Sequence, residues 1–198
     1  MTKKADIGSK KLISLSPNEW VRWVTGIPNL ETLEIISSDF QWVSREGDVL
    51  VKVTSPETGE FLILNEVQLR HDQNIPRRVR AYSGLAEEKY KCPIYPIVVN
   101  ILPPSETTNI APKYETNFLG IVARQDYKII NLWEVNVNIV FEQKINTLLP
   151  FVPVLKGGEN EEIIREALNI LRKDPQLNQL ENLLAFFATF VLKSELVQ

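Results

Sequence analysis

Two carboxylates and one amide stand at the ends of two short apolar runs in residues 45–72. Asp48 opens the first run, Glu66 closes the second, and Gln68 follows two positions later. Hard Mg²⁺ takes one or two carboxylates and completes its coordination with water and phosphate oxygens. Side chains of these types would suit metal-assisted hydrolysis of a phosphodiester, provided that the fold brings them together.

The two runs are expected to form a β-hairpin, and its register decides which side chains meet. The runs and the turn between them are residues 49–54, 60–67 and 55–59. Because side chains alternate between faces, pairing Thr54 with Glu60 places Asp48 opposite Glu66, with Gln68 on the same face. Like charges at opposed positions are destabilising, and a cation between them would remove that cost. A slip of one residue would separate the group. The alternative interpretation is that these are the solvated, charged ends of strands.

A short helix before the hairpin carries a third acid. Ser16 is an expected N-cap, Pro17 the first helical residue, and Gly26 the residue just past the end. Glu19 in the first turn would add a further carboxylate ligand if this helix packs beside the hairpin. The alternative is an acid favoured there by the helix dipole.

A helix expected over residues 76–91 provides positive charge close to Gln68 in sequence. Between positions 70 and 80 a single acid, Asp72, stands among four arginines: Arg70, Arg77, Arg78 and Arg80. Such a strip beside an acidic pair suggests a polyanion held next to a metal, and the alternative is a solvated helix face. Arg78 and Tyr82 share a helical face, with Tyr82 either contacting nucleic acid or packing in the core. His71 is interpreted as a surface residue.

The remaining elements suggest a sheet protein with helices at its C-terminal end. Beyond the hairpin and the two helices, we expect extended segments and further helices at residues 30–43, 92–104, 118–135, 161–173 and 176–196. Residues 118–135 are expected to hold one or two strands, after a loop. This order predicts an α/β or α+β fold with a mixed strand arrangement.

Composition excludes several classes of protein. The 198 residues suffice for one core, and a net charge of −3 argues against coating nucleic acid by bulk charge. One cysteine, Cys92, and one histidine, His71, exclude an internal disulfide and a Cys/His zinc cluster. The N-terminus lacks a signal-peptide core, and the longest apolar run, residues 183–192, is about half the ~20 residues of a membrane span. We therefore expect a reduced, cytoplasmic protein without a membrane association.

The pattern Asp48, hairpin, Glu66-Val67-Gln68, then a helix with Arg78 resembles the core of the PD-(D/E)XK nuclease superfamily. More narrowly, it is similar to the recombination-promoting nuclease (Rpn)/putative transposase family, a branch with Glu-x-Gln where most members have Glu-x-Lys. The later segments "IYPIVVNILPP" and "YKIINLWEV" extend the resemblance over residues 16–154, and the N-terminal segment is similar to cyanobacterial members. The resemblance implies a restriction-endonuclease-like α/β core, with a central mixed sheet flanked by helices.

The resemblance also implies a metal-dependent DNA endonuclease acting in recombination or transposition. Asp48 and Glu66 would hold Mg²⁺ (or Mn²⁺), Glu19 would be the first-helix acid, and Gln68 would occupy the lysine position. A neutral amide can orient a water but cannot supply the charge of a lysine. Arg70, Arg77, Arg78 and Tyr82 would contact DNA, and the helix from Arg78 to Tyr82 would orient phosphate or support the site. The rival hypothesis is a catalytically inactive relative that serves as a nucleic-acid or protein interaction module.

The C-terminal region is expected to be an extension, with a nuclease domain over residues 1–155 and helices over 156–198. An apolar stripe at helical spacing runs along the last helix: Leu177, Leu180, Leu184, Phe187 and Val191. Two alternatives stay open for this stripe, packing on the domain or forming a homodimer interface suited to an enzyme that cuts two strands.

Overall fold

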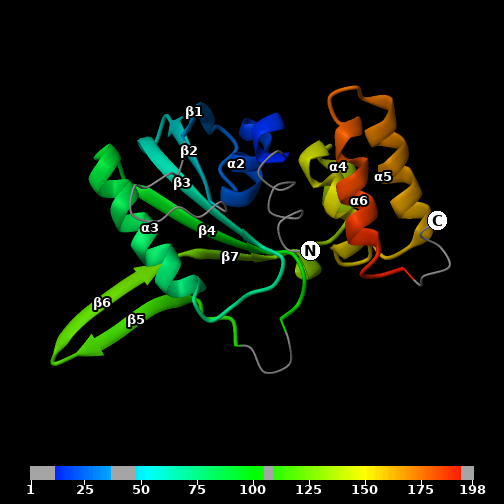
Figure 1. Ribbon diagram of the computed structural model, residues 1–198. Coiled ribbons are helices and arrows are strands. Elements are labelled where there is room, and N and C mark those ends of the chain that lie inside the picture. Colours follow the sequence, from blue (N-terminus) through cyan, green and yellow to red (C-terminus); the bar gives the residue numbers. More distant parts are fainter. Residues whose placement is uncertain (1–11, 37–47, 105–108, 193–198) are drawn as a thin grey trace.

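The computed structural model describes residues 12–36, 48–104 and 109–192, which fold around a five-stranded mixed sheet (Figure 1). Its strands are β1 (Glu31–Ile36), β2 (Asp48–Ser55), β3 (Gly59–Gln68), β4 (Ile94–Asn100) and β7 (Lys128–Asn131), in the order β1-β2-β3-β4-β7. The first three pair antiparallel, whereas β3, β4 and β7 pair parallel. The central strand β3 therefore joins the predicted hairpin to the parallel half of the sheet.

Helix α2 (Pro17–Thr25) covers one face of the sheet. It begins at the predicted proline and ends at Gly26, whose φ of 76° lies in the left-handed region that glycine adopts without strain. Trp20 is fully buried, and its Nε1 donates a hydrogen bond to Asn65 Oδ1 at 3.0 Å. Because Asn65 lies in the middle of β3, this bond fixes α2 on the sheet face to which Asn65 points.

Helix α3 (Ile75–Tyr90) covers the opposite face (Figure 1). Ile75 and Val79 form a small buried cluster with Val98 of β4. Val98 pairs with Glu66 in the parallel ladder, so the two side chains share a face. Glu66 directly follows Asn65 in β3, and successive strand residues point to opposite faces. The expected acidic site and helix α2 therefore lie on different faces of the sheet.

A separate two-stranded hairpin follows β4, formed by β5 (Lys113–Phe118) and β6 (Ile121–Asp126). One expectation is wrong here, because residues 113–117 were expected in a loop and instead form most of β5. The one or two strands expected over residues 118–135 are confirmed as β6 and β7. β5 was missed because most of its side chains are exposed on both faces, which leaves no apolar alternation in the sequence. Only β7, from the end of that region, joins the main sheet.

The chain after β7 forms short helical segments packed against the end of the sheet. These are η1 (Leu132–Glu134), α4 (Asn138–Glu142), η2 (Asn146–Val154), α5 (Glu161–Lys173), η3 (Asn178–Leu180) and α6 (Glu181–Ala188). The single long helix expected over residues 176–196 is wrong for its described part, which divides into η3, α6 and a final turn; residues 193–196 lie outside the described ranges. Contacts of α5 and α6 with η2 place the last helices on this segment.

The apolar stripe of the C-terminal region packs within the chain, as the first alternative predicts. Leu177, Leu180, Leu184 and Phe187 are all at most 5% exposed. Val191, at 39%, is the one stripe residue left at the surface. The homodimer through the C-terminal helices stays a prediction, and those four side chains would not be available to it.

The predicted α/β class is confirmed, with a central mixed sheet flanked by helices. β1 covers the first part of the extended segment expected over residues 30–43, and residues 37–43 lie outside the described ranges. Among the described helices, none has both the length and the apolar character that crossing a bilayer requires. The division between residues 155 and 156 stays a prediction.

Candidate functional site

The hairpin register that the site requires is present. β2 and β3 pair Thr54 with Glu60 and, six rungs further, Asp48 with Glu66. Gln68 lies two residues beyond Glu66 and so shares its face. The turn at residues 55–59 is closed by Ser55 Oγ, which accepts a hydrogen bond from the Thr58 backbone amide. The register is thus fixed from the turn outward, and it brings the backbone of Asp48 opposite Glu66; the Asp48 side chain lies outside the described part of the chain.

Glu66 is completely buried, and two neighbours converge on one of its carboxylate oxygens. Gln68 Nε2 donates a hydrogen bond to Glu66 Oε1, and Arg78 Nη2 lies 2.5 Å from the same oxygen. The Arg78 side chain is 19% exposed and reaches Glu66 from α3. A buried carboxylate is tolerated only with compensating charge and hydrogen bonds. Arg78 therefore contacts the acidic site directly, which fits the expected alternative that this helix supports the site.

A row of amides that the sequence did not predict continues from Gln68 across the parallel strands. Gln68 pairs with Asn100 of β4, and Asn100 with Asn131 of β7. Asn100 is fully buried, and its Nδ2 donates to Asn131 Oδ1 at 3.0 Å, while Asn131 Nδ2 donates to Glu134 Oε2 at 3.2 Å. All three amides end their strands at the carboxyl edge of the parallel half, where open α/β sheets bind ligands. The signal in the sequence was a single asparagine inside each of two apolar segments, Asn100 between Val99 and Ile101 and Asn131 between Ile130 and Leu132.

His71 is buried at this edge, so its interpretation as a surface residue is wrong. It is 5% exposed, and neither ring nitrogen has a hydrogen-bond partner among the described residues. Burial lowers the pKa of the ring, while the nearby Asn100 side chain and Asp72 act in the opposite direction. Its neighbours Arg70 and Asp72 are exposed, so His71 is the one side chain of residues 70–74 that is buried.

The buried ring of His71 should make folding stability depend on pH. A lowered folded pKa means that the unfolded chain, with its ordinary value of 6.5, takes up the proton first as the pH falls. Stability is therefore complete above about pH 6.5 and declines below it, by up to about 1.4 kcal/mol per pH unit until the folded pKa is reached. Urea unfolding from about pH 7.5 to about pH 5.5 measures the slope. His71→Gln should flatten it, because this is the only histidine; equal slopes would contradict the assignment.

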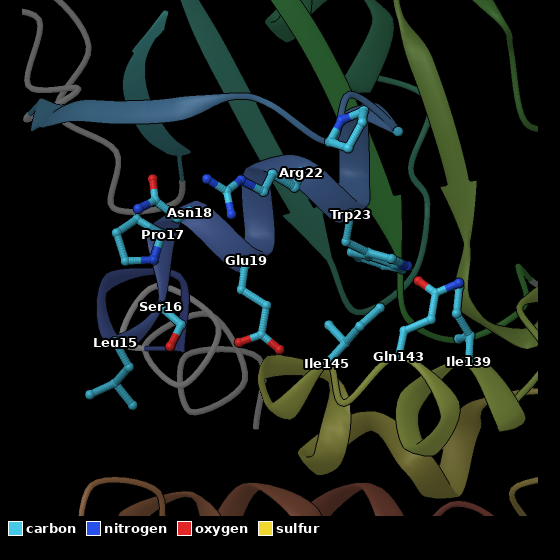
Figure 2. Close-up of a pocket in the computed structure, with 12 residues that line it drawn as sticks. Leu15, Ser16, Pro17, Asn18, Glu19, Arg22, Trp23, Ile139, Gln143 and Ile145 are labelled. Atoms are coloured by element: carbon cyan, nitrogen blue, oxygen red, sulfur yellow. The ribbon is translucent and has the colours of Figure 1, made fainter. Parts of the chain in front are cut away.

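Glu19 is not brought to Glu66. Its helix lies on the Asn65 face, and Figure 2 shows its carboxylate directed toward the segment at Ile145. Glu19 lines an open cavity of about 830 Å³ with Arg22, Trp23 and residues of the segment after β7. Burial raises the pKa of the Glu19 carboxyl, and the backbone amides of residues 146 and 147 oppose the rise. The alternative of a helix-turn acid fits this placement better than a ligand shared with Glu66.

The other predicted nucleic-acid contacts divide between surface and core. Arg70 is exposed and donates to the Pro103 carbonyl, and Arg77 is exposed on α3. Tyr82 is 4% exposed and belongs to the main core, so it contributes packing and leaves no surface for nucleic acid. Of the predicted nucleic-acid contacts, the arginines Arg70 and Arg77 therefore lie at the surface beside the site, and Tyr82 does not.

The donor chemistry at this edge fits a hard divalent cation. Glu66 and Gln68 present a carboxylate and an amide on one face, and the register adds Asp48 from β2. Arg78 already supplies positive charge at Glu66 Oε1. Within the described residues, no three His, Cys, Asp or Glu side chains gather into a metal-binding group. The set of ligands offered by the described side chains is therefore small, and Asp48 would have to complete it.

Searches of protein-family models, curated proteins and solved structures find no match to this chain.

Proposed function

We propose that this protein is a metal-dependent DNA endonuclease of the PD-(D/E)XK kind, hydrolysing phosphodiester bonds in recombination or transposition. The observation that carries the proposal is the β2–β3 register, which sets Asp48 opposite Glu66. Gln68 on the same face and Arg78 from α3 support it, because both contact the Glu66 carboxylate. The Asp, Glu-x-Gln and arginine positions of the sequence resemblance thus come from three adjoining elements.

The residues have distinct roles in this proposal. Asp48 and Glu66 hold Mg²⁺ (or Mn²⁺), which supplies Lewis-acid charge for the scissile phosphate and lowers the pKa of a water. Gln68, a neutral amide, orients that water or a phosphate oxygen by hydrogen bonding. Arg78, in the first turn of α3, holds the Glu66 carboxylate in place. The exposed Arg70 and Arg77 contact flanking phosphates.

Nicking of supercoiled plasmid tests the proposal, with Mg²⁺ and with a chelator. Glu66→Gln and Asp48→Asn keep side-chain size and remove the charge that holds the metal, so each is expected to nick about 10³-fold more slowly than the wild type. Glu60→Gln is the matched control, because Glu60 lies on the same strand, is 56% exposed and pairs with Lys52 at the far end. Equal nicking by Glu66→Gln, Asp48→Asn and the control would assign the activity to a contaminant and overturn the proposal.

One observation favours a second function, that of a catalytically inactive nuclease fold acting as a nucleic-acid or protein interaction module. Glu66 is completely buried, and its Oε1 is already engaged by Arg78 and Gln68. A carboxylate neutralised in this way has less need of a metal. Electron paramagnetic resonance of Mn²⁺ separates the two functions, since the enzyme requires stoichiometric binding that Glu66→Gln abolishes. DNA binding without any Mn²⁺ uptake would favour the interaction module.

A further inference from the structure

The β5–β6 hairpin presents four large apolar side chains to solvent. At its tip Phe118, Leu119, Ile121 and Val122 are 74%, 87%, 75% and 61% exposed. Figure 1 shows the hairpin projecting from the body of the protein beside α3, with its turn at the far end. We call these four residues the apolar tip. Apolar side chains that stay in water do not stabilise the fold, so the apolar tip indicates an interaction with another molecule.

The turn of this hairpin uses a residue that its conformation disfavours. Leu119 and Gly120 form a two-residue connection, and both have left-handed φ values, 52° and 81°. Such type I′ turns favour Asn-Gly because a branched apolar side chain is strained at positive φ. A leucine there is both strained and exposed, and an asparagine would fit the backbone better. A contact between the Leu119 side chain and a binding partner would explain why a leucine stands at this position.

The root of the hairpin is anchored to α3 next to exposed positive charge. The Arg80 guanidinium lies over the Tyr114 ring, 4.8 Å from its centre, and Arg77 is close enough to help lower the pKa of Tyr114. Between β6 and β7, the Tyr127 hydroxyl donates to the Ala111 carbonyl at 2.6 Å. These contacts fix the direction in which the tip points relative to the arginines of α3.

The positive and negative charges on the hairpin strands balance, so the excess of positive charge near the hairpin comes from α3. Lys113 pairs with Glu115, and Arg124 with Asp126. Arg77 and Arg80 are exposed beside these pairs, with no acid in the first turn of α3. The surface around the hairpin root is therefore cationic, whereas the whole chain carries a net charge of −3. An apolar projection with cationic flanks matches the bases and phosphates of a nucleic acid.

We propose that the apolar tip is a wedge that enters duplex DNA and unstacks a base step, while Arg77 and Arg80 contact the flanking phosphates. Apolar side chains inserted between base pairs, with arginines on the backbone, are an established way to open and bend a duplex. This inference deepens the proposed nuclease function, on which it rests, by naming a deformed duplex as the substrate. It also assigns substrate recognition to a hairpin separate from the Glu66 site.

A second copy of the chain is a poorer occupant for the same surface. The hairpin offers 14 residues from Lys113 to Asp126, and a standard protein interface takes about 20–30 residues on each side. Pairing two tips would also bring the cationic roots of both copies together. The observations thus favour a polyanion with apolar faces over a protein copy.

A duplex carrying 2-aminopurine tests the wedge, because this base fluoresces more strongly when it is unstacked. The wild type should raise the emission on binding, and Leu119→Asn should abolish the rise and weaken binding about tenfold. Asparagine suits the left-handed turn, so this variant should unfold at the same temperature as the wild type or higher. Leu33→Asn is the matched control, because Leu33 is 49% exposed on the edge strand β1; it should behave as the wild type.

The outcomes separate this inference from the nuclease proposal. Salt-dependent binding and Mg²⁺-dependent nicking without any rise in emission would overturn the wedge and leave the nuclease standing. An emission rise that Leu119→Asn retains would also overturn it. Light scattering that shows a dimer dissociated by Leu119→Asn would assign the tip to a second copy. Absence of both DNA binding and nicking would overturn both proposals.

Discussion

Replacing Arg78 with methionine is expected to lower the free energy of unfolding by about 3 kcal/mol. Arg78 Nη2 lies 2.5 Å from Oε1 of Glu66, a carboxylate with no exposed surface. Methionine retains an apolar stem of similar length and removes only the guanidinium, so the loss reports on charge. The Glu66 carboxylate would then stay buried without the positive charge of Arg78. The neutral Gln68 amide, which donates a hydrogen bond to it, cannot replace that charge.

A double-mutant cycle separates this interaction from other effects of the substitution. Glu66→Gln removes the buried charge, so Arg78→Met should cost much less in that background, with a coupling energy of about 1–3 kcal/mol. Urea unfolding provides the four free energies. Arg80→Met is the control on the same helix; its guanidinium stacks on Tyr114 at the surface and should contribute about 1 kcal/mol or less. Equal costs of Arg78→Met with and without the Glu66 charge would contradict the pairing.

The pairing of Asp48 with Glu66 could be predicted because it depends only on local information. A turn with Pro56 and Gly59 fixes where two short runs reverse, and the two-residue period of a strand then determines every partner. The same kind of local signal places α2, whose first residue is Pro17 and whose end is Gly26. Segments that are close in sequence and joined by a short turn have few possible arrangements relative to each other.

The amide row and the buried His71 could not be predicted, because they depend on parallel pairing between distant strands. Gln68 meets Asn100 only when β4 adds to β3, and Asn131 only when β7 adds to β4. No turn connects these strands, so nothing in the sequence specifies their register. The placement of Glu19 failed for a related reason. A shared site depended on its helix packing beside the hairpin on the Glu66 face; the helix packs on the opposite face, through Trp20 and Asn65, and the sequence does not specify the face.

The buried state of Glu66 shows why a charged strand end is ambiguous in a sequence. The pattern of an apolar run followed by Glu-x-Gln fits both a solvated end and a covered site. The distinction comes from α3, which brings Val79 and Arg78 over the same face. A buried carboxylate with its own counter-charge is costly for folding, and such groups are concentrated at functional sites. This is the physical reason to place the candidate site here and not at Glu19.

Phe187→Ala is expected to have the other large effect, a loss of about 3–5 kcal/mol. Phe187 of α6 is fully buried, and its ring centre lies 5.1 Å from that of Phe151 in η2. Phe151 in turn lies 6.4 Å from Trp20 of α2, which is bonded to β3 through Asn65. One aromatic row thus connects the C-terminal helices to the sheet, and a cavity at Phe187 should weaken both.

Two probes of urea unfolding decide whether the region after residue 155 is a separate unit. All four tryptophans lie before residue 155, so their fluorescence reports on the sheet region, whereas far-ultraviolet circular dichroism also reports on the C-terminal helices. Phe187→Ala should move both transitions equally to lower urea, because the cavity lies in a shared core. Phe190→Ala is the matched control, since Phe190 is 41% exposed in the same segment, and its cost should stay within about 1 kcal/mol. A fluorescence transition left unchanged by Phe187→Ala would instead mean that the helices fold as an appendage, and the core of the candidate nuclease would end where the sequence predicted.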